Sequence, residues 1–505
     1  MKGRELQVDQ VRYSEAYKRA VTLLLMMAYT FNAMDRTIIS IISQSMKLDL
    51  KLTDTQLGLL GGTAFAILYA CGGIPIARLA ERVSRVNIIT AALVIWSSLT
   101  GLCAVAATFS QLLLIRVGVG VAEAGCSPPA HSLISDYFEP ARRTSALSVY
   151  SCGTSLGYLL AAICGGYVAQ HFGWRAACAM VGVPGVITAL LIKIFIREPP
   201  RGYSEALAAG RAPSVGKPVA PFSLGAELRE LRAVAKALLL DWPVLHMVLG
   251  VTIGGFAAYG FYAFLPPYLS RAFDLDYTTI GIIAGLAGGV AVGVGIVAGG
   301  FIADYLGERS ARWYALVPAI GGLIAVPFYV LAFVQADWRT ATWCLALGGF
   351  FQYASLGPTF GVVQNMVDKR RRATATAMLY ICLSVFALGG GPLFTGWAID
   401  RFAEMSFQHA DSSAPASGLD GGAARQSRDG ASFAASCPGG TAPARASAAA
   451  KFACRSTLAV ATRRGILVTL LFLAWASVHY FLAAIGIGKS LRAAAVRNAA
   501  VAESQ

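Results

Sequence analysis

The sequence contains a series of apolar stretches, each about 20 residues long, which is the length that a helix needs to cross a bilayer. Only 14% of the 505 residues are charged and 56% are hydrophobic, whereas about a quarter of the residues of a soluble domain are charged. A soluble enzyme can bury a few such helices but not a dozen. The sequence therefore predicts an all-α polytopic membrane protein, with spans at 19–41, 53–77, 87–107, 111–135, 145–168, 176–196, 245–267, 279–303, 313–334, 341–364, 373–396 and 465–487.

The formal net charge of +15 raises the possibility of nucleic-acid binding. The basic residues instead recur in small groups between the apolar stretches, as they do in cytoplasmic loops. With the N-terminus inside, the short outer loops carry only Lys47, Lys51, Arg175, Arg271 and Arg339. We therefore expect a multi-pass protein of the bacterial inner membrane with both termini in the cytoplasm, and no nucleic-acid partner.

The expected spans form two groups of six that resemble each other. Leu79-Ala80-Glu81 matches Ile302-Ala303-Asp304, and the residues from Arg142 to Ala146 match those from Arg371 to Ala375. Many transporters build two bundles around a central site from such repeats. We expect a cytoplasmic segment 1–18, an N-terminal bundle 19–196, a cytoplasmic linker 197–244 with an amphipathic helix, a C-terminal bundle 245–488 and a cytoplasmic tail 489–505.

Residues 402–460 form an expected long extracytoplasmic loop within the C-terminal bundle. This loop is rich in Ala, Gly and Ser, so we expect most of it to be disordered. It holds Cys437 and Cys454, the only two of the ten cysteines outside the expected spans. An oxidising compartment would allow these two to form a disulfide, and the alternative is a pair of free thiols. No cysteine shows the spacing of metal ligands, and we expect no metal or cofactor.

Ionisable residues inside the spans are costly and therefore mark functional candidates. Asn32, Asp35 and Arg36 can share one face of the first span, and Arg116 and Glu123 lie two turns apart in the fourth. One interpretation is structural: the acids and arginines form buried ion pairs whose only role is to hold the bundle together. Alternatively, a carboxylate titrates during transport while Arg36 binds an anionic group with its planar fork. Asp35 or Glu123 would then carry the proton.

Aromatic residues cluster in the expected seventh span, in the segment GGFAAYGFYAFLPPY. The offset that relates Leu79 to Ile302 places Tyr259 of this segment opposite Arg36, and Tyr262 lies one turn further on. An aromatic wall here would suit the apolar part of an amphipathic ligand. Ordinary packing or contact with lipid is the open alternative.

The segment ARLAERVSR, from Ala77 to Arg85, resembles the signature of the major facilitator superfamily, Gly-x-Leu-Ala-Asp-Arg-x-Gly-Arg. The segment GFIADYLGER in the second half is similar to it. Ala77, Glu81 and Ser84 depart from the signature, although glutamate keeps the charge of aspartate. The resemblance implies a fold of 12 helices in two pseudo-symmetric bundles, and a cytoplasmic gate that includes Glu81, Arg82, Arg85, Asp136 and Asp304.

Within this superfamily, the Asn-x-x-Asp-Arg pattern of the first span and the Gly120/Glu123/Ala124 pattern of the fourth resemble the Spinster-like transporters of lipids and lysolipids. The anion:cation symporters for organic acids also carry an Asp-Arg pair and a glutamate at these places. The resemblance implies proton coupling through Asp35 and Glu123. It also implies that Arg36 and Arg116 bind substrate or belong to a charge network.

We therefore predict a monomeric secondary transporter, not an enzyme, whose partners are protons, membrane lipids and a small substrate that is an organic anion or an amphipathic lipid-like molecule. Broad-specificity efflux is the alternative within transport. A membrane-embedded lipid-modifying enzyme would need a nucleophile or metal constellation, and no histidine has a partner at a fixed spacing. A sensor would need a sizeable output domain, for which residues 197–244 are too few.

Overall fold

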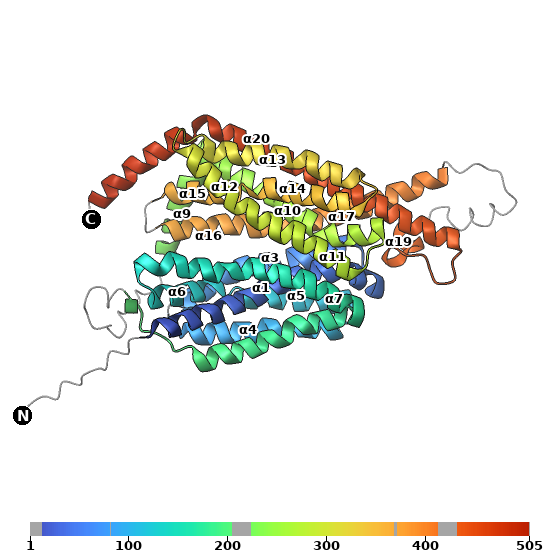
Figure 1. The fold of residues 1–505 in the computed structure, drawn as a ribbon, viewed down its shortest axis with the longest axis horizontal. Helices are drawn as coiled ribbons and strands as arrows, with labels where there is room; N and C mark the ends of the chain where they lie inside the picture. Colours follow the sequence, from blue (N-terminus) through green and yellow to red (C-terminus); the bar gives the residue numbers. More distant parts are fainter. Residues whose placement is uncertain (1–12, 81, 205–223, 368–370, 413–431, 504–505) are drawn as a thin grey trace, which may run out of the picture.

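The computed structural model describes residues 13–80, 82–204, 224–367, 371–412 and 432–503, and no strand occurs in these ranges. The helices form two bundles that lie side by side (Figure 1). The N-terminal half contains α1 (Glu15–Leu50), α2 (Asp54–Gly58), η1 (Leu59–Thr63), α3 (Ala64–Ala80), α4 (Arg85–Leu102), η2 (Cys103–Val105), α5 (Phe109–Glu123), α6 (Ser127–Tyr137) and α7 (Pro140–Phe195).

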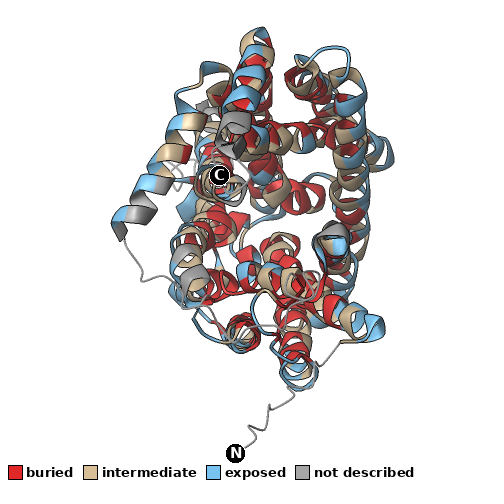
Figure 2. Cartoon of the chain, turned by 90° about the vertical axis from the view of Figure 1, so that its left-hand side faces the viewer, coloured by how far each residue is buried: buried red, intermediate tan, exposed pale blue. Residues whose placement is uncertain are grey.

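The C-terminal half follows after residue 223. It contains α9 (Leu224–Leu239), α10 (Trp242–Phe273), α11 (Tyr277–Ala284), η3 (Gly285–Val290), α12 (Ala291–Gly307), α13 (Trp313–Val334), α14 (Trp338–Tyr353), α15 (Leu356–Asn365), α16 (Arg372–Cys382), η4 (Leu383–Leu388), α17 (Gly389–Ser412), α19 (Phe433–Ser436), η5 (Pro438–Gly440) and α20 (Ala448–Glu503). In the view along the helices, the buried residues lie mainly inside the two bundles (Figure 2).

The helices have the length and composition of membrane spans. Nine stretches of the described chain are long and apolar enough to cross a bilayer. One of them, in α7, consists of two helical segments, because the chain turns at Gly173, where φ is 84°. α1 and the consecutive helices α14 and α15 are less apolar, and α1 carries Asn32, Asp35 and Arg36 near its middle. The arrangement confirms the predicted all-helical fold of two bundles and is consistent with 12 spans.

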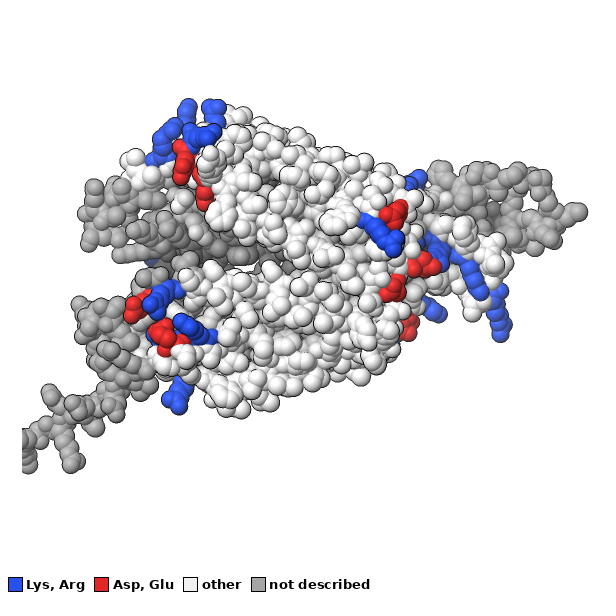
Figure 3. All heavy atoms as spheres, viewed as in Figure 1, with Lys and Arg blue, Asp and Glu red and all other residues white. Residues whose placement is uncertain are grey.

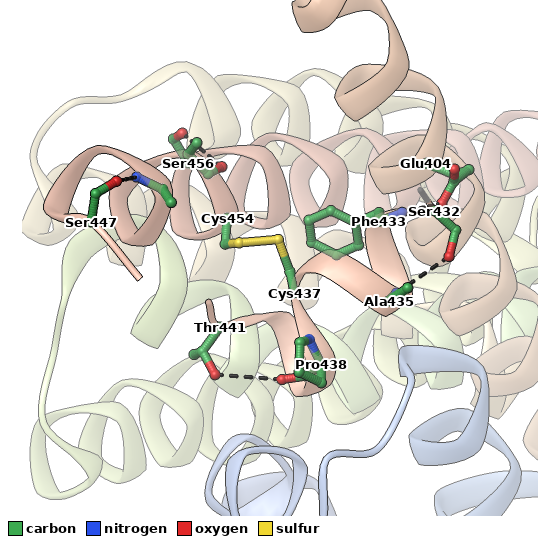
Figure 4. The surroundings of a disulfide bond; sticks show 12 residues. Glu404, Ser432, Phe433, Ala435, Cys437, Pro438, Thr441, Ser447, Cys454 and Ser456 are labelled. Carbon is green, nitrogen blue, oxygen red and sulfur yellow. Dashed lines mark hydrogen bonds between the residues drawn. A yellow bond between two sulfur atoms is a disulfide. The ribbon is translucent and has the colours of Figure 1, made fainter. Parts of the chain in front are cut away.

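Charged side chains gather at the two ends of the molecule on the face shown in Figure 3, with a broad uncharged band between them. We call one end the Arg85 end, after the residue at which α4 begins. The other is the disulfide end, because Cys437 and Cys454 are bonded there, with their Cα atoms 5.8 Å apart (Figure 4). An uncharged band between two charged ends is the surface expected of a protein that spans a bilayer.

The disulfide ties an ordered cap to α20. This cap consists of residues 432–447, and we call it the clasp. The Glu404 carboxylate accepts a hydrogen bond of 2.7 Å from the Phe433 backbone N–H (Figure 4). The Phe433 ring packs on that of Phe407, with the ring centres 5.6 Å apart. α17 also runs on to Ser412 and α20 begins at Ala448. The expectation of disorder over most of 402–460 is therefore wrong for its described parts, because helices and a buried aromatic ring order them. Residues 413–431 lie outside the described residues.

The clasp also touches the other half of the molecule. Gly439 and Gly440 have φ of 68° and 85°, a region that favours glycine. A Cβ atom at Gly439 would lie only 3.0 Å from the Lys47 carbonyl oxygen at the end of α1. The two glycines therefore allow the clasp, which belongs to the C-terminal half, to lie directly on the N-terminal half.

The disulfide predicts a pattern of thiol labelling. In protein denatured without a reductant, Cys437 and Cys454 should resist alkylation, and both should react once a reductant is added. Peptide mass spectrometry measures this directly. In the control variant Cys437→Ser, Cys454 should react without reduction. Alkylation of both residues in the unreduced wild-type protein would contradict the bond.

Candidate functional site

The ionisable residues predicted in the first and fourth spans lie together inside the N-terminal half. The Asp35 carboxylate accepts a hydrogen bond of 2.7 Å from Nη1 of Arg116, and its second oxygen accepts from the Thr100 hydroxyl. The side chains of Asp35 and Arg116 are each only 1% exposed. Opposite charges this deeply buried stabilise each other only when they stay paired and hydrogen-bonded.

The second ion pair of this network joins Arg36 to Glu123. Nε of Arg36 donates to Oε2 of Glu123 at 2.8 Å, and the Asn32 amide donates to the same oxygen at 2.9 Å. Glu123 is fully buried, whereas 31% of the Arg36 side chain is exposed. Oε1 of Glu123 has no hydrogen-bond partner within the described part of the chain. The network of two acids and two arginines is neutral overall, and Arg36 is its only member with a substantial exposed surface.

The Arg36 guanidinium lies against two neighbouring aromatic rings, which stack on each other with their centres 5.3 Å apart. Its central carbon is 4.8 Å from the Phe65 ring centre and 4.6 Å from that of Tyr69. The ring faces attract the cation and fix its plane. Phe65 reaches this place because α3 packs closely on α5, where a Cβ atom at Gly120 would lie 2.6 Å from the Phe65 carbonyl oxygen. Glu123 occupies only Nε, so its ion pair does not use the two terminal nitrogens, whose geometry suits bidentate binding of an anionic group.

The C-terminal half holds a cavity of about 140 Å³ between α10, α13, α14, α15, α16, η4 and α20. Its polar lining consists of Tyr259, Gln352, Tyr353, Ser355, Tyr380, Ser477 and Tyr480, with no charged residue among the lining residues. Tyr259, which the sequence placed opposite Arg36, is part of this wall. Tyr262 is not among the lining residues, and its backbone carbonyl accepts a hydrogen bond of 2.9 Å from the Ser40 hydroxyl where the two halves meet.

Two of the expected gate residues, Arg85 and Asp136, form an ion pair in this structure. Arg85 is buried and donates to Asp136, to Glu198 at 2.6 Å and to the Ser132 hydroxyl at 2.9 Å. All of these partners belong to the N-terminal half or to the segment that follows it. Arg82 and Asp304 are exposed, and Glu81 lies outside the described residues. Sequence reasoning missed Glu198, which ties the start of the linker to Arg85.

Sequence reasoning also missed a buried ion cluster at the disulfide end, formed by Lys47, Asp54 and Arg271, which we call the latch. The fully buried Asp54 carboxylate accepts from Lys47 Nζ at 2.8 Å and from Arg271 Nη2 at 2.6 Å. Arg271 belongs to the C-terminal half, so this carboxylate joins the two halves. The expectation that Lys47 and Arg271 lie in outer loops is wrong, because α1 and α10 continue past them and bury their charges.

The other two nitrogens of the Arg271 guanidinium also donate hydrogen bonds. Nε donates to the Gln44 amide oxygen and Nη1 donates to the Thr462 hydroxyl, each at 2.8 Å. Gln44 lies in the N-terminal half and Thr462 in the C-terminal half. The sequence did contain a signal for this cluster, because Lys47 and Arg271 are exceptions to the rule that basic residues lie in inner loops.

A second carboxylate, from Asp400 in α17, holds the first turn of α2. It accepts from the backbone N–H groups of Asp54 and Thr55 at 3.0 and 2.8 Å, and from the Thr55 hydroxyl at 2.6 Å. A carboxylate at a helix N-terminus pairs with free N–H groups and with the helix dipole. A Cβ atom at Gly396 would lie 2.1 Å from the Asp54 carbonyl oxygen, so the backbones of the halves are in direct contact here. The disulfide end is thus closed in this structure.

The substitution Asp54→Asn should destabilise the protein strongly, because it leaves two buried cations without their shared anion. Removing one partner of a buried ion pair costs about 3–5 kcal/mol. Thermal unfolding of the purified protein in detergent measures the loss.

The matched control for this prediction is Asp49→Asn, five residues earlier on the same side of the protein. Asp49 pairs with Arg175 at the surface, where the two side chains are 44% and 43% exposed. An exposed pair contributes about 0–1 kcal/mol, so this variant should unfold close to the wild-type temperature. Equal effects of the two substitutions would show that the latch does not stabilise the closed end.

The chain is similar to known membrane transporters along most of its length. The family model described as Major Facilitator Superfamily matches residues 25–391. The MFS-type efflux pump of Mycolicibacterium smegmatis is 32% identical over 381 residues, which cover 75% of this chain and 84% of that protein. The hexuronate transporter of Bacillus subtilis is 25% identical over 402 residues, which cover 77% of this chain and 90% of that protein.

A solved structure extends this similarity to the whole fold. A bacterial homolog of the human lysosomal transporter Spinster, crystallised in an inward-facing and occupied conformation, superimposes with a TM-score of 0.76 at 30% identity. The alignment covers 93% of this chain and 97% of that one. The resemblance that the sequence motifs predicted is confirmed.

Proposed function

The chain belongs to the major facilitator superfamily, and on that premise we propose that it moves an organic anion with an apolar body across the membrane, coupled to protons. The observation that carries this proposal is Arg36, the only substantially exposed member of an otherwise buried, neutral network. A purely structural pair would gain nothing from leaving 31% of the Arg36 side chain exposed.

Arg36 is the proposed contact for the anionic group of the substrate. Its plane is fixed by Phe65 and Tyr69, and Glu123 engages only Nε. A carboxylate or phosphate can bind the two terminal nitrogens bidentately without first displacing Glu123. The relative from Bacillus subtilis is named for hexuronates, which are carboxylates.

Glu123 is the proposed proton carrier. An anion bound to Arg36 competes for the cation that neutralises Glu123, and a buried carboxylate without a cation is costly. Oε1 of Glu123 can accept a proton without losing a hydrogen bond, because it has no partner within the described residues. Asp35 would support this step by keeping Arg116 neutralised, so that one proton and one anion enter together.

The cavity in the C-terminal half is the proposed site for the apolar body of the substrate. Tyr259 and Tyr380 line its wall, and no charged residue is among the lining residues. An amphipathic anion would therefore place its charge in one half and its apolar part in the other. Loosely specific efflux is a second candidate, favoured by this uncharged cavity and by the relative from Mycolicibacterium smegmatis that is named an efflux pump.

We also propose that the Arg85 end faces the cytoplasm of a bacterial cell and that the protein acts as a monomer. The arginine-rich turns at this end support that orientation, and the disulfide at the other end would then lie in an oxidising compartment. The closed latch would seal the outer side, so that this structure represents a state open toward the cytoplasm.

The substitution Arg36→Lys should impair transport more than folding. Lysine keeps the positive charge but cannot donate two parallel hydrogen bonds to one anionic group. A hydrogen bond to a charged group contributes about 1.5–3 kcal/mol, so substrate affinity should fall about 10- to 100-fold. Uptake by proteoliposomes and thermal unfolding measure the two effects. Arg175→Lys, in an exposed pair, is the matched control and should transport normally. Normal uptake by Arg36→Lys would remove Arg36 from the site.

Substrate-driven proton movement tests the coupling. Proteoliposomes containing a pH-sensitive dye receive hexuronates or lysolipids one at a time, and wild-type protein should give a substrate-dependent proton flux. Glu123→Gln should abolish this flux while still exchanging labelled for unlabelled substrate, because the neutral amide mimics the protonated acid.

The matched control is Glu15→Gln, which changes an exposed carboxylate at the start of α1 and should leave the flux unchanged. Flux that persists in both Glu123→Gln and Asp35→Asn would assign the buried acids a structural role only. If wild-type protein is stabilised by a substrate but moves no protons, the chain is a transporter with another coupling mode.

A further inference from the structure

We propose that His246 and His479 form a binding site for a transition-metal cation of the Zn²⁺, Cu²⁺ or Ni²⁺ type. The two residues lie on different helices, α10 and α20, and their Nδ1 atoms are 2.7 Å apart. Both rings are half-buried, so an ion can reach them. No local spacing pairs the two residues, because 233 positions of the sequence separate them.

The two histidines occupy matching positions in two similar segments. The sequence reads Trp242-Pro-Val-Leu-His246 on α10 and Trp475-Ala-Ser-Val-His479 on α20. The ring centres of Trp242 and His246 are 4.4 Å apart, and those of Trp475 and His479 are 5.8 Å apart. Each tryptophan therefore flanks its histidine and restricts how far the imidazole can turn. A pair of ligands that is already oriented loses less entropy when a metal binds.

The distance between the nitrogens suits a shared metal ion. Zinc binds imidazole nitrogen at about 2.0–2.1 Å in tetrahedral geometry, which sets two such nitrogens about 3.4 Å apart. The rings need to separate by roughly 0.7 Å to reach that spacing. Imidazole is a preferred ligand for Zn²⁺, Cu²⁺ and Ni²⁺ but not for Mg²⁺. Water would complete the coordination, because the described residues hold no cluster of three or more His, Cys, Asp or Glu side chains.

The position of the pair makes the ion accessible from the Arg85 end. His246 is in the second turn of α10, which begins at Trp242, and tryptophan residues concentrate where a membrane meets water. The pair also lies beside the cavity wall. Tyr480 follows His479 directly, and both α10 and α20 contribute residues to that wall. A metal bridge between these helices should therefore stiffen one side of the cavity.

The first test uses purified full-length protein, ZnCl₂ and thermal unfolding, with MgCl₂ as the ion control. Zn²⁺ should raise the unfolding temperature. Loss of a group that only supports a metal ligand weakens metal affinity about 10- to 100-fold. His246→Gln and His479→Gln each remove a ligand itself, so each should weaken the apparent affinity for Zn²⁺ by more than that. His171→Gln is the matched control. His171 is exposed on α7, in the other half of the molecule, and its ring contacts that of Tyr167. It should keep the wild-type response.

A second measurement needs no variant and so stands even if a substitution prevents folding. Diethyl pyrocarbonate modifies accessible histidines, and Zn²⁺ should protect His246 and His479 but not His171, as read by peptide mass spectrometry. With Cu²⁺, the electron paramagnetic resonance spectrum should show hyperfine coupling to imidazole nitrogen. Equal modification with and without Zn²⁺, or an unfolding shift that both histidine variants retain, would overturn the proposal.

Discussion

The cost of an unpaired charge inside a bilayer is the constraint on which the arrangement of this protein depends. Asp35 and Arg116 neutralise each other, and Glu123 neutralises Arg36. Each pair joins α1 to α5, so the two ion pairs fix how these helices lie against each other. Because Arg36 is the exposed member, any ligand that binds it also acts on Glu123. One set of contacts thus holds the bundle together and, under the proposed role of Arg36, would make its charge balance sensitive to a ligand.

The two halves resemble each other in sequence but divide the chemistry between them. The N-terminal half holds the paired charges, whereas the residues that line the cavity of the C-terminal half are uncharged and rich in tyrosine. The offset between the halves places Tyr259 where the first half has Arg36. A neutral aromatic side chain at this place needs no counter-ion, which leaves room for a cavity. An amphipathic anion would match this division, with its charge toward one half and its apolar part toward the other.

The spans, the two bundles and the five polar residues of the charge network followed from the sequence, because apolar length and buried charge are local properties. The partners within that network did not, since several pairings of two acids and two arginines were open. The latch was missed for a related reason: Lys47 and Arg271 lie at helix ends that hydropathy cannot distinguish from loops. The contact between His246 and His479 depends on how α10 packs against α20, which no local pattern encodes.

The latch shows how the closed end could open without leaving a charge in lipid. Lys47 and Asp54 belong to the same half, so they remain an ion pair when the halves separate. Arg271 stays with Thr462 in the other half and loses Asp54, but the opening that separates them also admits water. Its charge is then hydrated instead of buried, and the cost falls toward that of an exposed ion pair, about 0–1 kcal/mol. The same carboxylate can therefore hold the closed state firmly and release it at a small net cost, which alternating access requires.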